Sequence, residues 1–301
     1  MTRPARSEQV ILLTPAVVLL VGVFAVPAVL LVRVSFAEGQ SPPFESGWTA
    51  EYFGKLLSDP FYLELLLTSI RLSAITAAGS LAIGIPLAFF LWRTEGALRG
   101  ILLAATLLPL FTNVIARLYG WQILLANQGP VNKGLAALGL IDEPLRLNYS
   151  LFGAAVGLVY VVTPYVTLIL FGGIAQVHPD LVHAAHSLGA GSFRSAFETV
   201  LPLMKPAIVT AIAVAFAWGM GAYAETATLG SPAEWGIGYE TWRQHQLTHS
   251  WPFSSVLSIV MVVVTLLFTM VFARLPFMST RVRGQGQSQP RQVDLRHAEQ
   301  S

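Results

Sequence analysis

Six long apolar runs constrain the fold of this chain more than any other feature. They cover residues 10–32, 70–92, 101–126, 150–177, 206–228 and 251–273. A helix needs roughly 20 predominantly apolar residues to cross about 30 Å of hydrocarbon, and each run is long enough. Only 11% of the residues are charged. The pattern predicts an all-α polytopic membrane protein with six transmembrane helices, forming a single transmembrane domain over residues 1–275.

The distribution of basic residues predicts how the chain is oriented. With six spans, the connecting segments alternate between the two sides of the membrane. The side that holds both termini and the loops 93–100 and 178–205 carries eleven Lys and Arg residues, and the other side carries five. Because cytoplasmic segments are enriched in these residues, we expect both termini in the cytoplasm. Residues 276–301 are polar and predict a disordered cytoplasmic tail.

Residue usage excludes several kinds of site. The chain has no cysteine, which rules out disulfides, thiolate metal sites and cysteine nucleophiles. The pairs His183/His186 and His245/His249 have helical metal-ligand spacing but no nearby third ligand, so we predict no metal site. No catalytic constellation stands out in the spans. We therefore expect neither an enzyme nor a nucleic-acid partner.

The loop at residues 178–205 lies between the fourth and fifth runs and has its own pattern. Pro179 and Asp180 suit the first turn of a helix that runs through Leu188, and Gly189 suits its C-terminal cap. A second helix is predicted over residues 192–200, ending before Pro202. One face carries small and apolar residues, which predicts either docking into a partner's groove or packing on the protein's own helix ends.

This loop resembles the EAA loop of ABC importer permeases. The match comprises His183-Ala184-Ala185, Gly189-Ala190 and the terminal Leu201-Pro202, with His183 in place of the usual glutamate. Residues 109–132 and 251–260 resemble spermidine/putrescine-type permeases, and the likeness covers roughly residues 10–275. The resemblance implies that the loop couples to an ATPase through Leu181, His183, Ala184, Ala185, Leu188, Gly189, Ala190, Phe193, Phe197, Leu201 and Pro202.

The resemblance also implies a fold, a function and partners. We expect a type I ABC importer permease-like fold with a cytoplasmic coupling helix, in the cell inner membrane. The chain would form half of the path for a polyamine or related small solute. Its partners would be a second permease subunit, two ATP-binding cassette ATPases that hold ATP and Mg²⁺, an extracytoplasmic solute-binding protein and the lipid bilayer. The alternatives are another solute (an amino-acid derivative, opine, sugar or anion) or a self-contained secondary transporter.

Charged residues within the spans suggest where the path lies. Charges at membrane depth are costly and are usually paired or line water, so we expect Arg117 and Glu225 to lie near each other. The alternative is a purely structural ion pair or a snorkelling side chain. Aromatic faces attract cations, although Arg117 would repel them unless it is neutralised. Pro109, beside Thr112 and Asn113, predicts a bent helix. The substrate-path candidates are Asn113, Arg117, Trp121, Trp218, Tyr223 and Glu225.

Overall fold

The protein is described here from a computed structural model, which covers residues 6–42 and 44–274. Its first half comprises α1 (Arg6–Ser35), β1 (Ala37–Glu38), β2 (Glu45–Trp48), α2 (Glu51–Ser58), α3 (Pro60–Arg93), α4 (Gly96–Phe111), α5 (Val114–Leu125) and α6 (Pro130–Ala137). Its second half comprises α7 (Leu151–Ile174), α8 (Pro179–Ser187), α9 (Ser192–Ser195), the π-helical turn η1 (Ala196–Val200), α10 (Leu201–Leu203), α11 (Lys205–Met220), α12 (Ala224–Leu229), the 3₁₀ turn η2 (Pro232–Glu234), α13 (Ile237–Gln246) and α14 (Trp251–Arg274). The predicted tail 276–301 lies outside the described residues.

The helices confirm the all-α membrane fold, although two of the six apolar runs do not form single straight helices. Within the described residues, four helices are long and apolar enough to span a membrane: α1, α3, α7 and α14. α4 and the segment Val114–Ala137 form a bent pair, which turns by 100° and has the length and composition of either a broken fifth span or a re-entrant loop. The run 206–228 contains α11, a shorter apolar helix, followed by a break and α12.

The two breaks have different causes. Pro109 lies in the last turn of α4, and Asn113 starts α5 by accepting hydrogen bonds at Oδ1 from the N–H groups of Ile115 (2.8 Å) and Ala116 (3.3 Å). The predicted bend beside Thr112 and Asn113 is therefore confirmed, but it is sharp enough to end one helix and begin another. α11 ends at Met220, where the backbone of α13 packs against residues 221–222.

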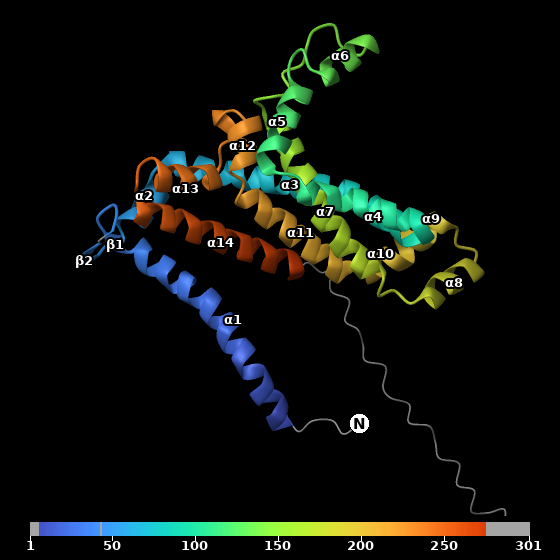
Figure 1. The fold of residues 1–301 in the computed structure, drawn as a ribbon, viewed down its shortest axis with the longest axis horizontal. Coiled ribbons are helices and arrows are strands. Elements are labelled where there is room, and N and C mark those ends of the chain that lie inside the picture. The colour runs from blue at the N-terminus through green and yellow to red at the C-terminus, as the bar shows by residue number, and fades with distance from the viewer. Residues whose placement is uncertain (1–5, 43, 275–301) are drawn as a thin grey trace, which may run out of the picture.

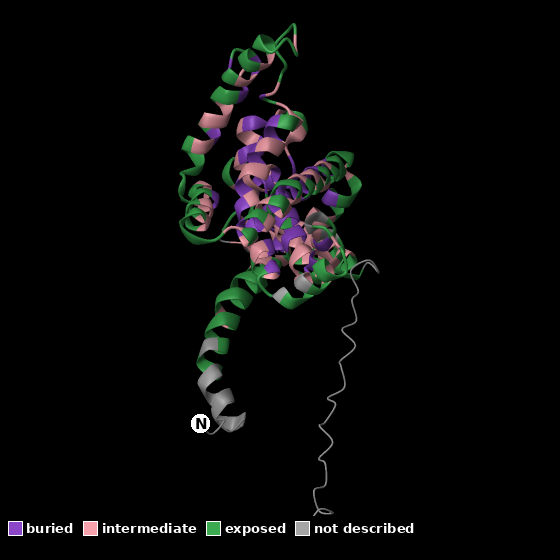
Figure 2. Cartoon of the chain, turned by 90° about the vertical axis from the view of Figure 1, so that its right-hand side faces the viewer, coloured by how far each residue is buried: buried purple, intermediate pink, exposed green. Residues whose placement is uncertain are grey.

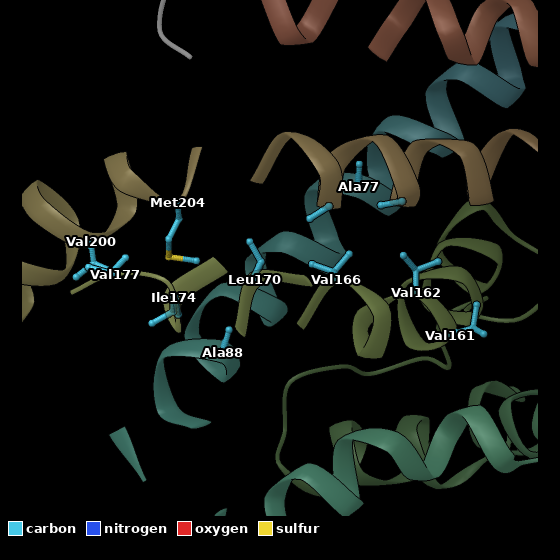
Figure 3. Packing of buried hydrophobic residues seen from close by; sticks show 12 residues of the cluster. Ala77, Ala88, Val161, Val162, Val166, Leu170, Ile174, Val177, Val200 and Met204 are labelled. Carbon is cyan, nitrogen blue, oxygen red and sulfur yellow. The ribbon is translucent and has the colours of Figure 1, made fainter. Parts of the chain in front are cut away.

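The core lies where α3, α7 and α11 pack together (Figure 1). α7 is buried along most of its length, which suits a helix that is apolar on every side. Figure 3 shows its residues Val162, Val166 and Leu170 facing side chains of the neighbouring helices. α3 and α11 approach closely at Gly219, where a Cβ atom would lie 2.5 Å from Ser73 Cα. Small residues allow such contacts between membrane helices.

Two parts of the chain lie apart from this core. α1 diverges from the bundle and is exposed along most of its described length, apart from its end at Ser35, whereas buried residues concentrate in the α3–α7–α11 packing (Figures 1 and 2). At one end of the bundle, α2, α13 and the start of α14 form a second buried cluster around Leu56, Ile237 and Phe253. α8 and α9 lie at the opposite end (Figure 1).

Candidate functional site

The loop between α7 and α11 has the predicted helix–turn–helix form. α8 ends at Ser187, and Gly189 adopts the left-handed conformation with φ = +85°. The N–H of Gly189 donates to His186 O (2.9 Å) and that of Ala190 donates to Ala185 O (3.0 Å). These two bonds form a Schellman motif, so the predicted glycine cap is confirmed. The cap fixes the direction in which the chain leaves α8.

The predicted end of the second loop helix was wrong. The helix does not stop before Pro202 but continues through the π-helical turn and α10 to Leu203. In that turn the N–H of Leu201 donates to Ala196 O, one residue further back than in an α-helix. Helical bonding resumes beyond it, since the N–H of Met204 donates to Val200 O (3.0 Å). The wider turn allows the helix to pass Pro202, which has no N–H to donate.

The loop has an exposed apolar side and an anchored base. The Leu188 side chain is 89% exposed and that of Leu181 is 46% exposed, while Ala184 is also exposed. Val200 and Met204 instead lie in the buried cluster of α3, α7 and α11. A force on the exposed side would therefore be transmitted to the core helices.

The remaining coupling-loop candidates fall into two groups. Some are only partly exposed, and for the others the structure describes the backbone but not the side chain. Ala185, Ala190, Leu201 and Pro202 are half-buried. The residues placed only by their backbones are His183, in α8, Phe193, in α9, and Phe197, in η1.

Arg117 and Glu225 lie together, on α5 and α12. Arg117 Nη2 is 3.5 Å from Glu225 Oε1, and each side chain is only 8% exposed. The contact is long and single, and the buried Nε of Arg117 has no hydrogen-bond partner among the described residues. A second link joins the same helices, because Gln122 Nε2 donates to Thr228 O (3.0 Å). As expected, the two charged side chains lie close together, but only one long hydrogen bond joins them.

The other path candidates are distributed over separate contacts. Asn113 is exposed at the break between α4 and α5. The Trp121 ring meets Tyr160 at 5.5 Å between centroids, and the Trp218 ring meets Tyr165 at 4.9 Å. The third aromatic candidate, Tyr223, stacks on Trp242 at 4.9 Å. Among the contacts described, only Arg117 and Glu225 join two members of the predicted set directly.

Sequence reasoning missed a polar cluster on α13. The buried carboxylate of Glu240 accepts from Arg243 Nε (Oε2, 2.7 Å) and Nη2 (Oε1, 2.7 Å), and from Gln244 Nε2 (Oε1, 2.7 Å). The hydrogen bonds to Glu240 raise the pKa of Arg243. The signal was the spacing i, i+3, i+4, which places the three residues on one helix face. It was not predicted because residues 229–250, between the last two apolar runs, contain no apolar run of their own.

An aromatic cluster on α13 was also missed. Trp235 stacks on Tyr239 at 4.1 Å, and Tyr239 lies 5.7 Å from the Trp242 ring. Together with Tyr223 these rings form a continuous aromatic surface at the α11–α12 break. Across residues 6–42 and 44–274, no group of three or more potential metal ligands occurs.

Comparison with known proteins places these features in context. The family described as "Binding-protein-dependent transport system inner membrane component" matches residues 80–278. The spermidine/putrescine transport system permease protein PotB of Escherichia coli (strain K12) is 30% identical over 249 residues, covering 82% of this chain and 90% of PotB. PotB of Salmonella typhimurium (strain LT2) is 29% identical over 275 residues, covering 91% and 95%.

A solved structure supports the same fold. A chain of a bacterial alginate ABC transporter, determined in complex with an alginate pentasaccharide-bound periplasmic protein, matches with a TM-score of 0.67 and 14% identity. The match covers 89% of this chain and 95% of that chain. This likeness supports the type I importer permease fold that the EAA-like loop predicts.

Proposed function

Because the chain belongs to the family of binding-protein-dependent transport system inner membrane components, we propose that it forms half of the path of an ATP-driven importer for a polyamine or a related compound. It is a permease subunit and not an enzyme. The observation that carries the choice of solute is the 29–30% identity to spermidine/putrescine permeases over most of the chain. The low charge of the chain and its apolar helices suit residence in the lipid bilayer.

The proposed assembly contains four further components. A second permease subunit completes the path, two cytoplasmic ATPases bind ATP and Mg²⁺, and an extracytoplasmic binding protein delivers the solute. The excess of basic residues on one side supports cytoplasmic termini and a cytoplasmic loop 178–205. The alginate transporter of similar fold was captured with a periplasmic solute-bound protein, which supports a comparable arrangement.

In this assembly, α8 and its flanking turns act as the coupling element. The exposed side chains of Leu181 and Leu188 would seat in a cleft of one ATPase, where burial of apolar surface stabilises docking. Closure of the ATPases on ATP would displace α8. Val200 and Met204 would carry that displacement into α7 and α11, because both are packed in the core. His183 stands where the EAA loop pattern has a glutamate, so the docking contact at that position would differ.

The proposed solute path runs past the α4–α5 break and the Arg117–Glu225 pair. Non-helical backbone within the hydrocarbon region is tolerated only where protein or water covers it, and Thr112 and Asn113 are exposed in this chain. These residues therefore suit a water-filled path at the contact with the second permease. Glu225 accepts only one long hydrogen bond from Arg117, which leaves acceptor capacity for a cationic solute. Trp121, Trp218 and Tyr223 add aromatic faces.

Uptake into membrane vesicles tests this proposal. Labelled spermidine or putrescine should accumulate only when ATP and the binding protein are present, and accumulation should persist when a protonophore abolishes the proton gradient. Uptake that follows the proton gradient and ignores ATP depletion would favour a secondary transporter. ATP-driven uptake of a different solute, with neither polyamine competing, would keep the importer but refute the polyamine assignment.

A further inference from the structure

The short helix α12 carries Glu225, and its position depends on contacts with other parts of the chain. It has six residues, Ala224–Leu229, and follows the break at the end of α11. Helices shorter than about 12 to 15 residues are marginal on their own, because the first turn fixes several residues for a single hydrogen bond. The place of the Glu225 carboxylate is therefore set by the elements that hold α12.

Close packing fixes α12 on α7. The Leu229 side chain is fully buried, and a Cβ atom added to Gly157 of α7 would lie 2.6 Å from Leu229 Cδ1 and 3.5 Å from Glu225 Cγ. The N–H of Ser150 donates to Leu229 O (3.1 Å). The described contacts with α7 reach only the stem of the Glu225 side chain, so they do not orient its carboxylate.

Two polar links join α12 to α5. In the first, Arg117 Nη2 lies 3.5 Å from Glu225 Oε1. In the second, Gln122 Nε2 donates to Thr228 O at 3.0 Å. At a rise of about 1.5 Å per residue, the links start about 7.5 Å apart along α5 and end about 4.5 Å apart along α12. Two separate points of attachment fix the relative angle of the helices as well as their distance.

Of these two links, the hydrogen bond from Gln122 is the tighter constraint. Its length lies in the normal range for an N–H···O bond, whereas the Arg117 contact lies at the long limit. Thr228 O is also one of the last four carbonyls of α12, and such carbonyls have no N–H partner within their own helix. The amide of Gln122 therefore caps the end of α12.

The ion pair does not hold this geometry by itself. Both side chains are buried, and Nε of Arg117 has no hydrogen-bond partner within the part of the chain that the structure describes. A buried charge is costly unless it stays close to its counter-charge. Because the contact with Glu225 is already 3.5 Å long, a small rotation of α12 away from α5 would break it. The hydrogen bond from Gln122 opposes that rotation.

We propose that Gln122 is a positioning residue of the solute path, which holds Glu225 against Arg117 by capping α12. The Gln122 side chain acts through the pair and does not need to touch the solute. The inference rests on the proposed function only for the statement that the pair borders the path. The effect of Gln122 on the pair follows from the contacts alone and is the same for any solute.

A double-mutant cycle in three backgrounds tests this role. Arg117→Gln, Glu225→Gln and their combination are introduced into the wild type, Gln122→Met and Tyr149→Phe. Methionine has about the length of glutamine but no N–H donor. Tyr149→Phe is the matched control, because it removes the longer contact of Gln122 (3.4 Å to Tyr149 Oη) and leaves the bond to Thr228 O. Thermal unfolding of the full chain, purified with the subunits that accompany it, gives the interaction within the pair in each background.

The proposal predicts that only the loss of the amide donor uncouples the pair. In the wild type and in Tyr149→Phe, the double variant should lose less stability than the sum of the two single variants, whereas in Gln122→Met the two losses should add. A merely structural hydrogen bond would lower every midpoint and leave the interaction intact. An interaction of wild-type size in Gln122→Met, or its loss in Tyr149→Phe, would therefore overturn the proposal.

Two further substitutions of Gln122 complete the series. Gln122→His keeps one N–H donor in its neutral form and should restore part of the interaction. Gln122→Asn is one methylene group shorter and should uncouple the pair as methionine does. It takes the place of Gln122→Met if that variant does not fold. A histidine variant that behaves as the methionine variant does would count against the N–H donor as the cause.

Uptake by membrane vesicles separates this inference from the proposed function. With spermidine or putrescine as the probe, Gln122→Met should raise the half-saturating concentration about 2- to 10-fold, the range for the loss of one neutral hydrogen bond. In the Glu225→Gln background it should have no further effect, because the positioned carboxylate is already absent. A further loss in that background, or an unchanged half-saturating concentration in Gln122→Met alone, would overturn the role of Gln122 in the path. If the thermal cycle gives the expected result but wild-type vesicles import neither amine, only the proposed transport function has failed.

Discussion

Replacement of Gly189 is the sharpest single perturbation of the proposed coupling element. At φ = +85° this residue occupies a conformation that side chains other than glycine adopt only with strain. An alanine in a left-handed conformation costs about 1 to 2 kcal/mol. That cost changes the ratio of capped to uncapped α8 by roughly 5- to 30-fold. A valine adds a branched Cβ and should cost more, whereas asparagine, which tolerates this conformation, should cost less.

The functional consequence follows from the position of the cap. Loss of the bonds that Gly189 and Ala190 donate would allow α8 to swing relative to the anchored residues Val200 and Met204. ATP-driven uptake should then fall in the order Gly, Asn, Ala, Val, while ATP hydrolysis becomes less dependent on the solute-loaded binding protein. The thermal stability of the chain should change little, since the neighbouring Leu188 is almost fully exposed.

Gly191 provides the control for this series. It lies two residues further along, its backbone is not left-handed, and a Cβ atom added to it would meet no neighbouring atom within 4 Å. Gly191→Ala should therefore transport as the wild type does. Normal uptake by Gly189→Val, measured in vesicles at equal expression, would refute the reasoning that this cap couples α8 to the core.

Three further predictions concern the packing and the buried charges. Glu225→Gln leaves Arg117 buried without a counter-charge and should cost about 3 to 5 kcal/mol. In a thermal-unfolding double-mutant cycle with Arg117→Gln, the double variant should lose less stability than the sum of the two single variants; strictly additive effects would count against a direct interaction. Glu240→Gln weakens charge-assisted hydrogen bonds on α13 and should lower stability by about 1.5 to 3 kcal/mol, measured by the same unfolding assay, whereas an unchanged midpoint would contradict the buried cluster. Gly219→Ala crowds Ser73 and should cost about 1 to 3 kcal/mol, while Gly172→Ala, which meets open space, should not; equal midpoints for the two variants would refute the close α3–α11 approach.

Local sequence patterns predicted those features of the structure that are determined by residues close together in the chain. Pro179, Asp180 and Gly189 predicted α8 and its cap, because capping is set by residues within one or two turns. The position of Arg117 and Glu225 in the third and fifth predicted spans, both toward the same side of the membrane, was sufficient to expect their proximity. The roles of these residues in coupling and in the solute path remain predictions.

Features that depend on contacts distant in the chain could not be predicted in the same way. The break after Met220 is set partly by α13 packing against residues 221–222, which no local pattern around Met220 reveals. The π-helical turn before Pro202 permits a helix that a proline rule would end. The helix α13 is too short and too polar to be recognised by an apolar run, so its buried Glu240 and its aromatic rings were not predicted.

The central claim is that the exposed side of α8 docks on an ATPase, and affinity purification tests it most directly. The tagged chain is isolated from native membranes in mild detergent, beside a Leu188→Glu variant that places a charge on the exposed apolar side. We predict that the wild type brings down a second permease and an ATP-binding cassette ATPase, and that the variant keeps the permease but loses the ATPase. A wild-type chain that purifies alone, or an ATPase that stays bound to both chains equally, would contradict the account.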